Sequence, residues 1–393
     1  MNIRIPVASY HPRIGGQSSH ITWLSKGLKA LGHNVEILSL SHYPGFIAKP
    51  VTGVLGKIFP RYFCCGKILS TKILENLLCG SLEKKKGGIV NAQDVVATMA
   101  AKRANYKVIL TVHGDITREF HALGMLNAGA YQWFLNYEMA AYQNADWIVC
   151  VDTRLKNHVI QLHQESYKKI TVIHNFIDVM EFRKNVEKER ERKKLLKEKL
   201  GFPDDAFVVL LTRRFVPKNG VIYALKALDE LINKRRHTKY FLILAGKGEE
   251  GGLLKHFVKS NHLENYVYFC GPIPNQEIPI YYAIADVNVV PSVNIGGYIE
   301  ATSISAIEGL SSGIPTVASG IGGLKEMIID NWNGLLFEEK NHFQLADILE
   351  GLRKNYSTLQ EKLSTNAYTH AIKNHHYMNA SKQFEYIYEN FMP

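Results

Sequence analysis

Short apolar runs of strand length alternate with segments of helical periodicity along most of the 393-residue chain. Val108–Val112 and Phe207–Leu211 are such runs, and the apolar residues of 21–31 recur at helical spacing. Strands separated by helices pair in parallel, in sheets that the helices cover. The pattern therefore predicts an α/β fold, and the length suits two domains of ordinary size.

The composition is that of a globular protein, with 46% apolar and 21% charged residues. The N-terminus has no signal-peptide pattern, and no apolar run reaches the roughly 18 residues that could span a bilayer. The cysteines show no zinc-type spacing, and their odd number fits poorly with a disulfide framework: Cys64, Cys65, Cys79, Cys150 and Cys270. We therefore expect a protein of the reducing cytoplasm.

The segment Pro291–Gly323 carries the most functional information. Its pattern predicts a buried strand, a glycine-containing loop with Glu300, and a helix that contains Glu308. Backbone N–H groups near Ser303 would be free at the start of this helix and would attract a phosphate. Carboxylates can accept hydrogen bonds from two hydroxyls at once, so the segment would suit a nucleotide sugar. The alternative is an ordinary strand–loop–helix with solvated glutamates.

A basic loop, TRRFVPKNG (Thr212–Gly220), follows the predicted strand Phe207–Leu211. Its cations therefore lie at the carboxyl end of a strand, where open α/β sheets bind their ligands. The alternative is a solvated basic turn.

These two segments resemble the E-x7-E motif and the diphosphate loop of glycosyltransferase family 4, retaining sugar transferases of the GT-B fold. Further segments resemble the family in the same order along the chain: HPRIGGQSSHITWLSKGLKALGHNVEILSL (His11–Leu40), TVHGD (Thr111–Asp115), ADWIVCVD (Ala145–Asp152), VIHNFID (Val172–Asp178), LAGKGEE (Leu244–Glu250) and GPIPNQEIPIYYAIADVNVVPS (Gly271–Ser292). The chain departs from the family pattern where Asn219 stands in the usual place of a lysine, with Lys218 before it, and where Phe176 replaces a glycine. Ala301-Thr302-Ser303 stands where the family often has Gly-Phe-Gly.

The resemblance implies a GT-B architecture, with two Rossmann-like domains facing across a cleft. Residues 1–173 would form the acceptor-side domain and residues 174–375 the nucleotide-sugar-binding domain. A final helix in 376–393 would return to the first domain.

The resemblance also implies a hexosyltransferase that moves a sugar, with retention, from a nucleoside diphosphate sugar to a hydroxyl. A UDP-sugar is favoured as donor over GDP-mannose, and a lipid-linked or cell-surface glycan precursor is the expected acceptor. The catalytic candidates are Glu300 and His113 at the sugar, and Lys218 and Arg213 at the leaving diphosphate. The donor-binding candidates are Gly15, Gly16, Arg214, Gly246, Ser303 and, for the ribose, Glu308. Neither a metal nor another cofactor is expected, and either Arg213 or Arg214 could face the diphosphate.

Positive charge is concentrated in the first half of the chain. The net charge is +11, and residues 1–173 hold 20 Lys and Arg against 10 Asp and Glu, whereas residues 174–393 hold 27 against 26. Basic and large apolar residues mix in Phe46–Lys86, which favours an anionic membrane surface or a lipid-linked pyrophosphate acceptor. We therefore expect a cytoplasmic protein that is peripheral on the inner face of the cell membrane. A core helix flanked by solvated lysines is the alternative for this segment, and nucleic-acid binding is not expected.

Three other functions stay open from the sequence. A sugar phosphorylase or a nucleotide-sugar epimerase could share the fold, and activity with phosphate or water as acceptor would reveal it. A non-catalytic partner subunit could keep the fold and only bind. A lipid- or polyanion-binding protein would rest on the basic first half alone.

Overall fold

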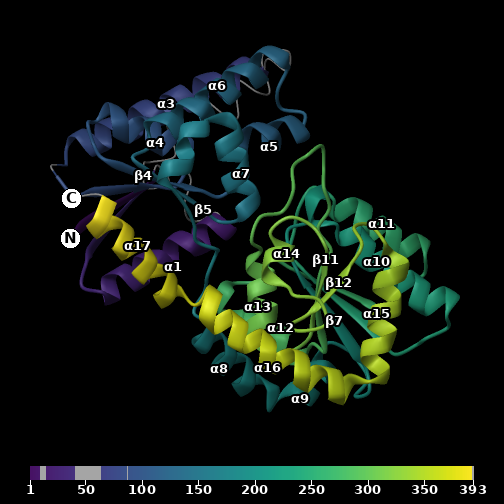
Figure 1. Ribbon diagram of the computed structural model, residues 1–393. Helices are drawn as coiled ribbons and strands as arrows, with labels where there is room; N and C mark the ends of the chain where they lie inside the picture. Colours follow the sequence, from purple (N-terminus) through teal and green to yellow (C-terminus); the bar gives the residue numbers. More distant parts are fainter. Residues whose placement is uncertain (9–14, 40–62, 86, 392–393) are drawn as a thin grey trace. The chain divides into compact units, whose positions relative to one another are not determined.

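The computed structural model describes residues 1–8, 15–39, 63–85 and 87–391 (Figure 1). The chain forms two compact units. The first unit contains Met1–Asn175, Gly296–Ala301 and Tyr377–Pro393, and the second contains Phe176–Ile295 and Thr302–His376. Compared with the domain boundaries expected from the sequence, the first unit thus also includes the short segment 296–301.

Among the described residues, the first unit holds a six-stranded parallel sheet in the order β2-β1-β3-β4-β5-β6. The strands are β1 (Asn2–Val7), β2 (Asn34–Ser39), β3 (Ile89–Ala92), β4 (Val108–Val112), β5 (Trp147–Cys150) and β6 (Ile170–Val172). The helices are α1 (Gly16–Ala30), α3 (Phe63–Glu83), α4 (Val95–Arg103), α5 (Ile116–Ala122), α6 (Ala128–Asn144), α7 (Thr153–Leu162) and α17 (Tyr377–Phe391).

The described part of the second unit holds another six-stranded parallel sheet, in the order β12-β11-β10-β7-β8-β9. Its strands are β7 (Phe207–Thr212), β8 (Tyr240–Ala245), β9 (Val267–Gly271), β10 (Val287–Val290), β11 (Thr316–Ser319) and β12 (Leu335–Phe337). Its helices are α8 (Val179–Arg190), α9 (Lys193–Lys199), α10 (Val221–Asp229), α11 (Gly251–Ser260), α12 (Ile278–Ile284), α13 (Ile304–Ser312), α14 (Leu324–Met327), α15 (His342–Lys354) and α16 (Tyr356–His375).

Both sheets are covered by helices, which explains why their central strands read as continuous apolar runs. Every residue of β4 and β8 is buried. Several helices start directly after a strand or loop at an aspartate whose carboxylate accepts a backbone N–H, as Asp115 does for α5 and Asp152 for α7. The predicted α/β fold with two Rossmann-like halves is therefore confirmed.

The last helix, α17, packs against α1 in the first unit (Figure 1). The two backbones come close at Gly27, where an added Cβ would lie 2.0 Å from Ser381 Oγ. Phe384, Ile387 and Tyr388 of α17 are buried, and the Tyr388 hydroxyl accepts a hydrogen bond of 2.8 Å from Asn91 Nδ2. The C-terminal helix thus contributes to the core and to a polar network of the first unit.

The basic–apolar segment expected at a membrane is only partly described. Residues 46–62 and Lys86 lie outside the described residues. In α3, Leu78 and Leu82 are buried in the core, and Glu75 is buried and accepts a hydrogen bond of 2.7 Å from the Tyr137 hydroxyl. This part is therefore a core helix, followed by the exposed Lys84 and Lys85. Within the described ranges, no helix combines the length and the apolar character that crossing a bilayer requires.

Candidate functional site

The candidate residues fall into two groups, one in each unit. The first unit carries Gly15, Gly16, His113 and Glu300, and the second carries Arg213, Arg214, Lys218, Gly246, Ser303 and Glu308. Apart from Glu300, whose loop follows β10 of the second sheet, these residues lie in loops and helices that follow parallel strands of their own unit. Ligand-binding side chains are typically found at this carboxyl edge of a sheet.

The two arginines of the basic loop after β7 differ in burial and in their contacts. Arg213 is buried, and its guanidinium donates to Ser292 Oγ at 2.7 Å and to Asn219 Oδ1 at 2.8 Å. Asn219 is also buried and donates to the carbonyl of Arg214 at 2.7 Å. Arg214 is exposed and Lys218 is partly exposed. Asn219, in the place where the family usually has a lysine, therefore shapes the loop together with Arg213.

Two glycines let the loops at this edge approach one another. Gly220 has φ 61°, and a Cβ there would lie 1.8 Å from the carbonyl oxygen of Pro291. A Cβ on Gly246 would lie 1.9 Å from the carbonyl oxygen of Arg213. Backbone atoms cannot yield at such distances, so any side chain at these positions would displace the loops. Gly246 thus supports the basic loop through packing, a role that the sequence did not indicate.

Glu308 lies in the middle of α13 and is buried together with Ser303, the residue that precedes the helix. The Tyr282 hydroxyl lies 3.3 Å from Glu308 Oε2 and 3.1 Å from Thr212 Oγ1. Burial raises the pKa of Glu308 to about 8, although hydrogen bonds from Tyr282 and Thr212 lower it in part. Near pH 7 the carboxyl group is therefore mainly protonated in the unliganded protein.

Thr212 connects the two parts of this group. It is the last residue of β7 and directly precedes the basic loop, and its Oγ1 lies 3.0 Å from Ser305 Oγ in α13. The side chain of Thr212 therefore joins the loop with Arg213, Arg214 and Lys218 to the helix with Glu308.

Glu300 belongs to the first unit and is buried in its loop. Gly296 and Gly297 adopt φ values of 57° and 86°, and the carbonyl of Ile299 accepts a hydrogen bond of 3.4 Å from Arg154 Nη2. Because α13 begins at Ile304, Glu300 precedes the helix and does not share it with Glu308. The two glutamates of the E-x7-E motif thus belong to different compact units.

His113 follows β4 and ends a chain of buried polar side chains. Its Nε2 lies 2.9 Å from Gln93 Oε1, and Gln93 Nε2 donates to Asn91 Oδ1 at 2.9 Å. Asn91 Nδ2 in turn donates to the Tyr388 hydroxyl. The direction of these bonds makes Gln93 Oε1 an acceptor, so the network assigns the proton to His113 Nε2 and leaves Nδ1 as an acceptor.

Burial, and secondarily the charge that His20 would carry, hold the pKa of His113 well below its usual range. The two imidazole rings meet edge to face with centroids 4.7 Å apart. His20 Nδ1 lies 3.0 Å from Asn175 Oδ1, and burial lowers the pKa of His20 to about 4. Both histidines are therefore neutral near pH 7.

The sequence analysis missed Gln93 and Asn91. The available indication was the stretch IVNAQD, in which polar residues follow an apolar strand at its carboxyl end, as at the other candidate sites. Three further histidine and carboxylate side chains of the first unit were also missed, and are described below.

The candidates Gly15 and Gly16 do not form a tight turn. Gly15 is in an extended conformation with φ 171°, and Gly16 is the first residue of α1. Among the described residues, apart from its neighbours in the chain, no atom lies within 4 Å of a Cβ position on Gly15. An extended φ is open to any residue, so what the pair provides is a helix N-terminus that no described side chain caps.

Two family models match the chain, and together they cover most of it. "Glycosyltransferase Family 4" matches residues 14–181, and "Glycosyl transferases group 1" matches residues 192–370.

Curated relatives align over nearly the full length at low identity. An uncharacterized glycosyltransferase of Methanocaldococcus jannaschii is 24% identical over 99% of this chain and 98% of its own. The alpha-monoglucosyldiacylglycerol synthase of Acholeplasma laidlawii is 23% identical over 93% of this chain and 92% of its own. The phosphatidylinositol N-acetylglucosaminyltransferase GPI3 subunit of Saccharomyces cerevisiae is 21% identical over 99% of this chain and 83% of its own.

Solved structures share the fold. Anabaena HepE, crystallised with UDP and glucose, superposes with a TM-score of 0.71 at 18% identity, covering 98% of this chain and 99% of its own. Sucrose-phosphate synthase from Thermosynechococcus elongatus superposes with a TM-score of 0.76 at 18% identity, covering 98% of each chain. These neighbours confirm the GT-B architecture.

Proposed function

Because the chain belongs to glycosyltransferase family 4, we propose that it is a retaining hexosyltransferase that uses a nucleoside diphosphate sugar. A UDP-sugar is the favoured donor, with GDP-mannose as the second choice. The observation that carries the proposal is Thr212, whose hydroxyl joins the basic loop to the helix of Glu308. Cations for a diphosphate and a carboxyl group for a ribose thus lie on adjoining elements of one unit.

In this proposal, Arg214 and Lys218 stabilise the leaving diphosphate. Arg214 is exposed and Lys218 partly exposed, whereas Arg213 is buried and holds the loop in shape. Negative charge develops on the phosphate as the glycosidic bond opens, so fixed cations lower the barrier. Cationic side chains supply the charge that a metal supplies in other transferases, and we therefore propose no metal for donor binding.

Glu308 would accept hydrogen bonds from the ribose hydroxyls, and it would lose its proton when they arrive. Its pKa of about 8 lies close to neutrality, so deprotonation costs little. The uncharged Tyr282 and Thr212 hydroxyls around it help to hold the carboxylate in place.

His113 and Glu300 would act at the donor sugar. The network through Gln93 leaves His113 Nδ1 as an acceptor for a sugar hydroxyl. Glu300 would bind sugar hydroxyls or stabilise the oxocarbenium-like centre. As the family resemblance implies, no protein nucleophile is needed, and a phosphate oxygen of the leaving group takes the proton of the acceptor hydroxyl.

A lipid-linked acceptor is the second part of the proposal, with action at the inner face of the cell membrane. The names of the Acholeplasma and yeast relatives both refer to lipids, diacylglycerol in one case and phosphatidylinositol in the other. The excess of positive charge in residues 1–173 supports the same class of acceptor, because anionic head groups attract clustered lysines.

Thermal-shift titration tests the donor assignment. A ligand that binds only the native state raises the melting temperature as its concentration increases. We expect UDP to raise it more than GDP or ADP, and Lys218→Ala to reduce the rise. The exposed Lys259 on α11 gives the control, because Lys259→Ala leaves the basic loop intact. If no nucleotide changes the melting temperature, the donor proposal is wrong.

Product analysis separates the rival functions. The purified protein is incubated with the UDP-sugar and, in turn, lipid acceptors, inorganic phosphate and water. Sugar transferred to lipid supports the proposal. Sugar 1-phosphate would indicate a phosphorylase, an altered nucleotide sugar an epimerase, and nucleotide binding without turnover a non-catalytic subunit.

A further inference from the structure

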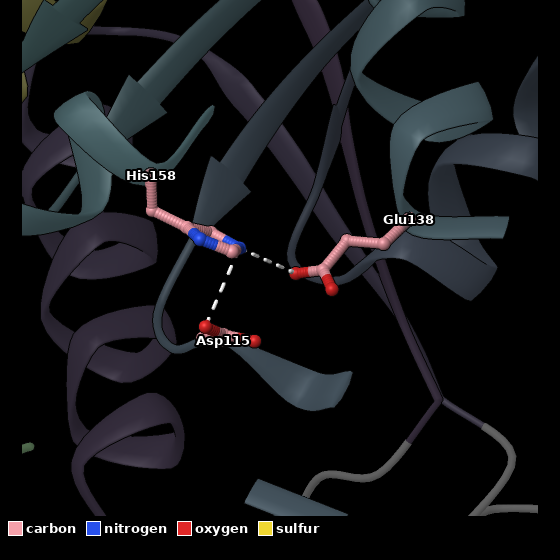
Figure 2. A group of neighbouring side chains, drawn as sticks. All are labelled: Asp115, Glu138 and His158. Atoms are coloured by element: carbon pink, nitrogen blue, oxygen red, sulfur yellow. Dashed lines mark ion pairs between the residues drawn. The ribbon is translucent and has the colours of Figure 1, made fainter. Parts of the chain in front are cut away.

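Asp115, Glu138 and His158 form a buried cluster in the first unit, apart from the candidate residues described above (Figure 2). Asp115 caps α5 just after β4, Glu138 lies in α6, and His158 lies in α7. The two carboxylate residues are 0% exposed and the histidine 5%. Figure 2 shows the three side chains pointing toward one another from three different elements.

His158 lies at distances from the two carboxylates that are close to those between ligands of one metal ion. His158 Nε2 lies 3.4 Å from Asp115 Oδ2 and 3.6 Å from Glu138 Oε1, and the ligand atoms all lie within 4.8 Å of one another. Two ligands of a tetrahedral zinc ion, each bonded at about 2.0–2.2 Å, are separated by about 3.4 Å. The two distances from His158 Nε2 are close to this separation.

Hydrogen bonding does not explain this arrangement. His158 Nε2 is buried without a hydrogen-bond partner. Asp115 Oδ2, which it faces, accepts no hydrogen bond either, although it forms an ion pair of 3.1 Å with Arg118 Nε. Direct N–H···O bonds have lengths of about 2.7–3.2 Å, shorter than the distances found here. Buried polar atoms normally have hydrogen-bond partners, so a buried His158 Nε2 that faces two carboxylate oxygens without such a bond indicates a missing ligand.

The carboxylates are held in position from outside the cluster. Glu138 accepts hydrogen bonds of 2.6 Å from the hydroxyls of Thr117 and Tyr142, one on each oxygen. Asp115 Oδ1 accepts the backbone N–H of Arg118 at 2.9 Å, and the Arg118 guanidinium lies 3.1 Å from Oδ2. Such outer contacts orient ligands and are typical of metal sites.

We propose that Asp115, Glu138 and His158 bind a divalent transition-metal ion, Zn²⁺ in the first place. An imidazole with two carboxylates suits Zn²⁺, whereas Mg²⁺ and Ca²⁺ prefer oxygen ligands alone. The cation would also offset two buried carboxylates, which repel each other. The proposal concerns a site in the first unit and departs from the sequence-based expectation that the chain holds no metal.

The ion would have a structural role. It would join the β4–α5 loop to α6 and α7, and Asp115 is only two residues beyond His113 in this loop. A rival occupant is a proton that makes His158 an imidazolium between the two carboxylates. The two occupants differ in whether the protein binds metal at all, which is directly measurable.

Metal binding by the full-length protein tests the proposal. Protein that has been dialysed against a chelator and then against buffer is titrated with Zn²⁺ by calorimetry, and with Co²⁺ while the visible spectrum is recorded. We expect one equivalent of Zn²⁺ per chain, visible absorption bands of protein-bound Co²⁺, and a melting temperature that rises with Zn²⁺. Failure of the wild-type protein to bind a stoichiometric ion would overturn the proposal in favour of the proton.

Variants of the proposed ligands test whether the ion binds at this cluster. His158→Asn should weaken Zn²⁺ binding by at least about 100-fold, because even loss of an outer contact costs 10–100-fold. His256→Asn, at an exposed position on α11, is the control and should bind as the wild type does. Binding by His158→Asn within about threefold of the wild type would show that the metal lies elsewhere. If His158→Asn does not fold, the same comparison is made with Glu138→Gln, which keeps the side-chain shape.

Discussion

The polar groups around His113 in the first unit differ in kind from those around Glu308 in the second. Asn91, Gln93 and His113 form a network of neutral side chains, and the buried His20 contacts the His113 ring. In the second unit, a basic loop adjoins a buried carboxyl group whose pKa is raised to about 8. A neutral network suits the hydroxyls of a sugar, whereas cations and an ionisable carboxyl suit a nucleoside diphosphate. The comparison shows that the first unit offers neutral hydrogen-bonding groups at its candidate site, whereas the second offers cations and an ionisable carboxyl group.

The largest expected effect is the loss of transfer on replacing Glu300, and comparison with Glu308 should separate the roles of the two glutamates. Glu300→Ala should lower transfer by more than about 1,000-fold and leave UDP affinity nearly unchanged, because the nucleotide alone has no sugar for Glu300 to bind. Glu308→Ala should weaken UDP binding itself. Calorimetry with UDP and a transfer assay measure the two quantities, and the reverse pattern would mean that the roles are exchanged.

The two units should respond to pH in opposite directions. His20 has a folded-state pKa of about 4, below its usual 6.5, so its contribution to stability is present above pH 6.5 and is lost as the pH falls toward 4. Glu308 has a folded-state pKa of about 8, above its usual 4.5, so its contribution is present below pH 4.5 and is lost as the pH rises through 8.

Urea unfolding followed by tryptophan fluorescence, in a Trp332→Phe background, measures how the stability of the first unit falls at acid pH. The remaining tryptophans all belong to that unit: Trp23, Trp133 and Trp147. His20→Gln should reduce the loss of unfolding free energy between pH 6.5 and 4 by up to about 3 kcal/mol, at about 1.36 kcal/mol per pKa unit. Identical pH dependence in the variant and its parent would contradict the assignment of the shift to His20.

Lys218→Ala tests the cationic loop and should lower kcat and kcat/KM together by about 100-fold, as loss of a group acting on developing charge does. Arg214→Ala should have an effect of the same kind. Lys259→Ala should change neither constant. Turnover of Lys218→Ala within about twofold of the wild type would show that the loop does not bind the diphosphate.

Gln93→Leu tests the neutral network and should lower kcat by about tenfold, equivalent to about 1.4 kcal/mol, because His113 loses the partner that orients its ring. UDP affinity should stay unchanged, since the nucleotide does not require His113. Gln93→Glu keeps an acceptor for His113 Nε2 and should recover part of the activity. Equal kcat in Gln93→Leu and the wild type would mean that the network has no part in orienting His113.

The smallest expected effect concerns the membrane. The protein should sediment with vesicles that contain phosphatidylglycerol and much less with neutral vesicles, and salt should release it. Lys84 is exposed on the first unit, and Lys84→Gln should weaken the association about fivefold, equivalent to about 1 kcal/mol. Lys259→Gln, in the less basic second unit, should leave it unchanged. Equal sedimentation with both kinds of vesicle would favour a soluble acceptor.

The local sequence pattern was sufficient to predict the fold class, because strand and helix periodicity are properties of neighbouring residues. Buried parallel strands such as β4 and β8 read as apolar runs, and their order along the chain predicted two sheets covered by helices. Pattern also indicated where the candidate residues would lie, at the ends of strands. It did not indicate backbone conformation, as the extended φ of Gly15 shows.

The sequence by itself determined the α/β class, the two Rossmann-like halves and the family. Only the tertiary structure distinguished the buried Arg213 from the exposed Arg214, because Ser292, which binds Arg213, is 79 residues away along the chain. The same holds for Asp115, Glu138 and His158, which no motif spacing connects and which three separate elements bring together. Periodicity reflects contacts with neighbours in the sequence, whereas burial, pKa shifts and ligand geometry depend on residues that meet only in the folded chain.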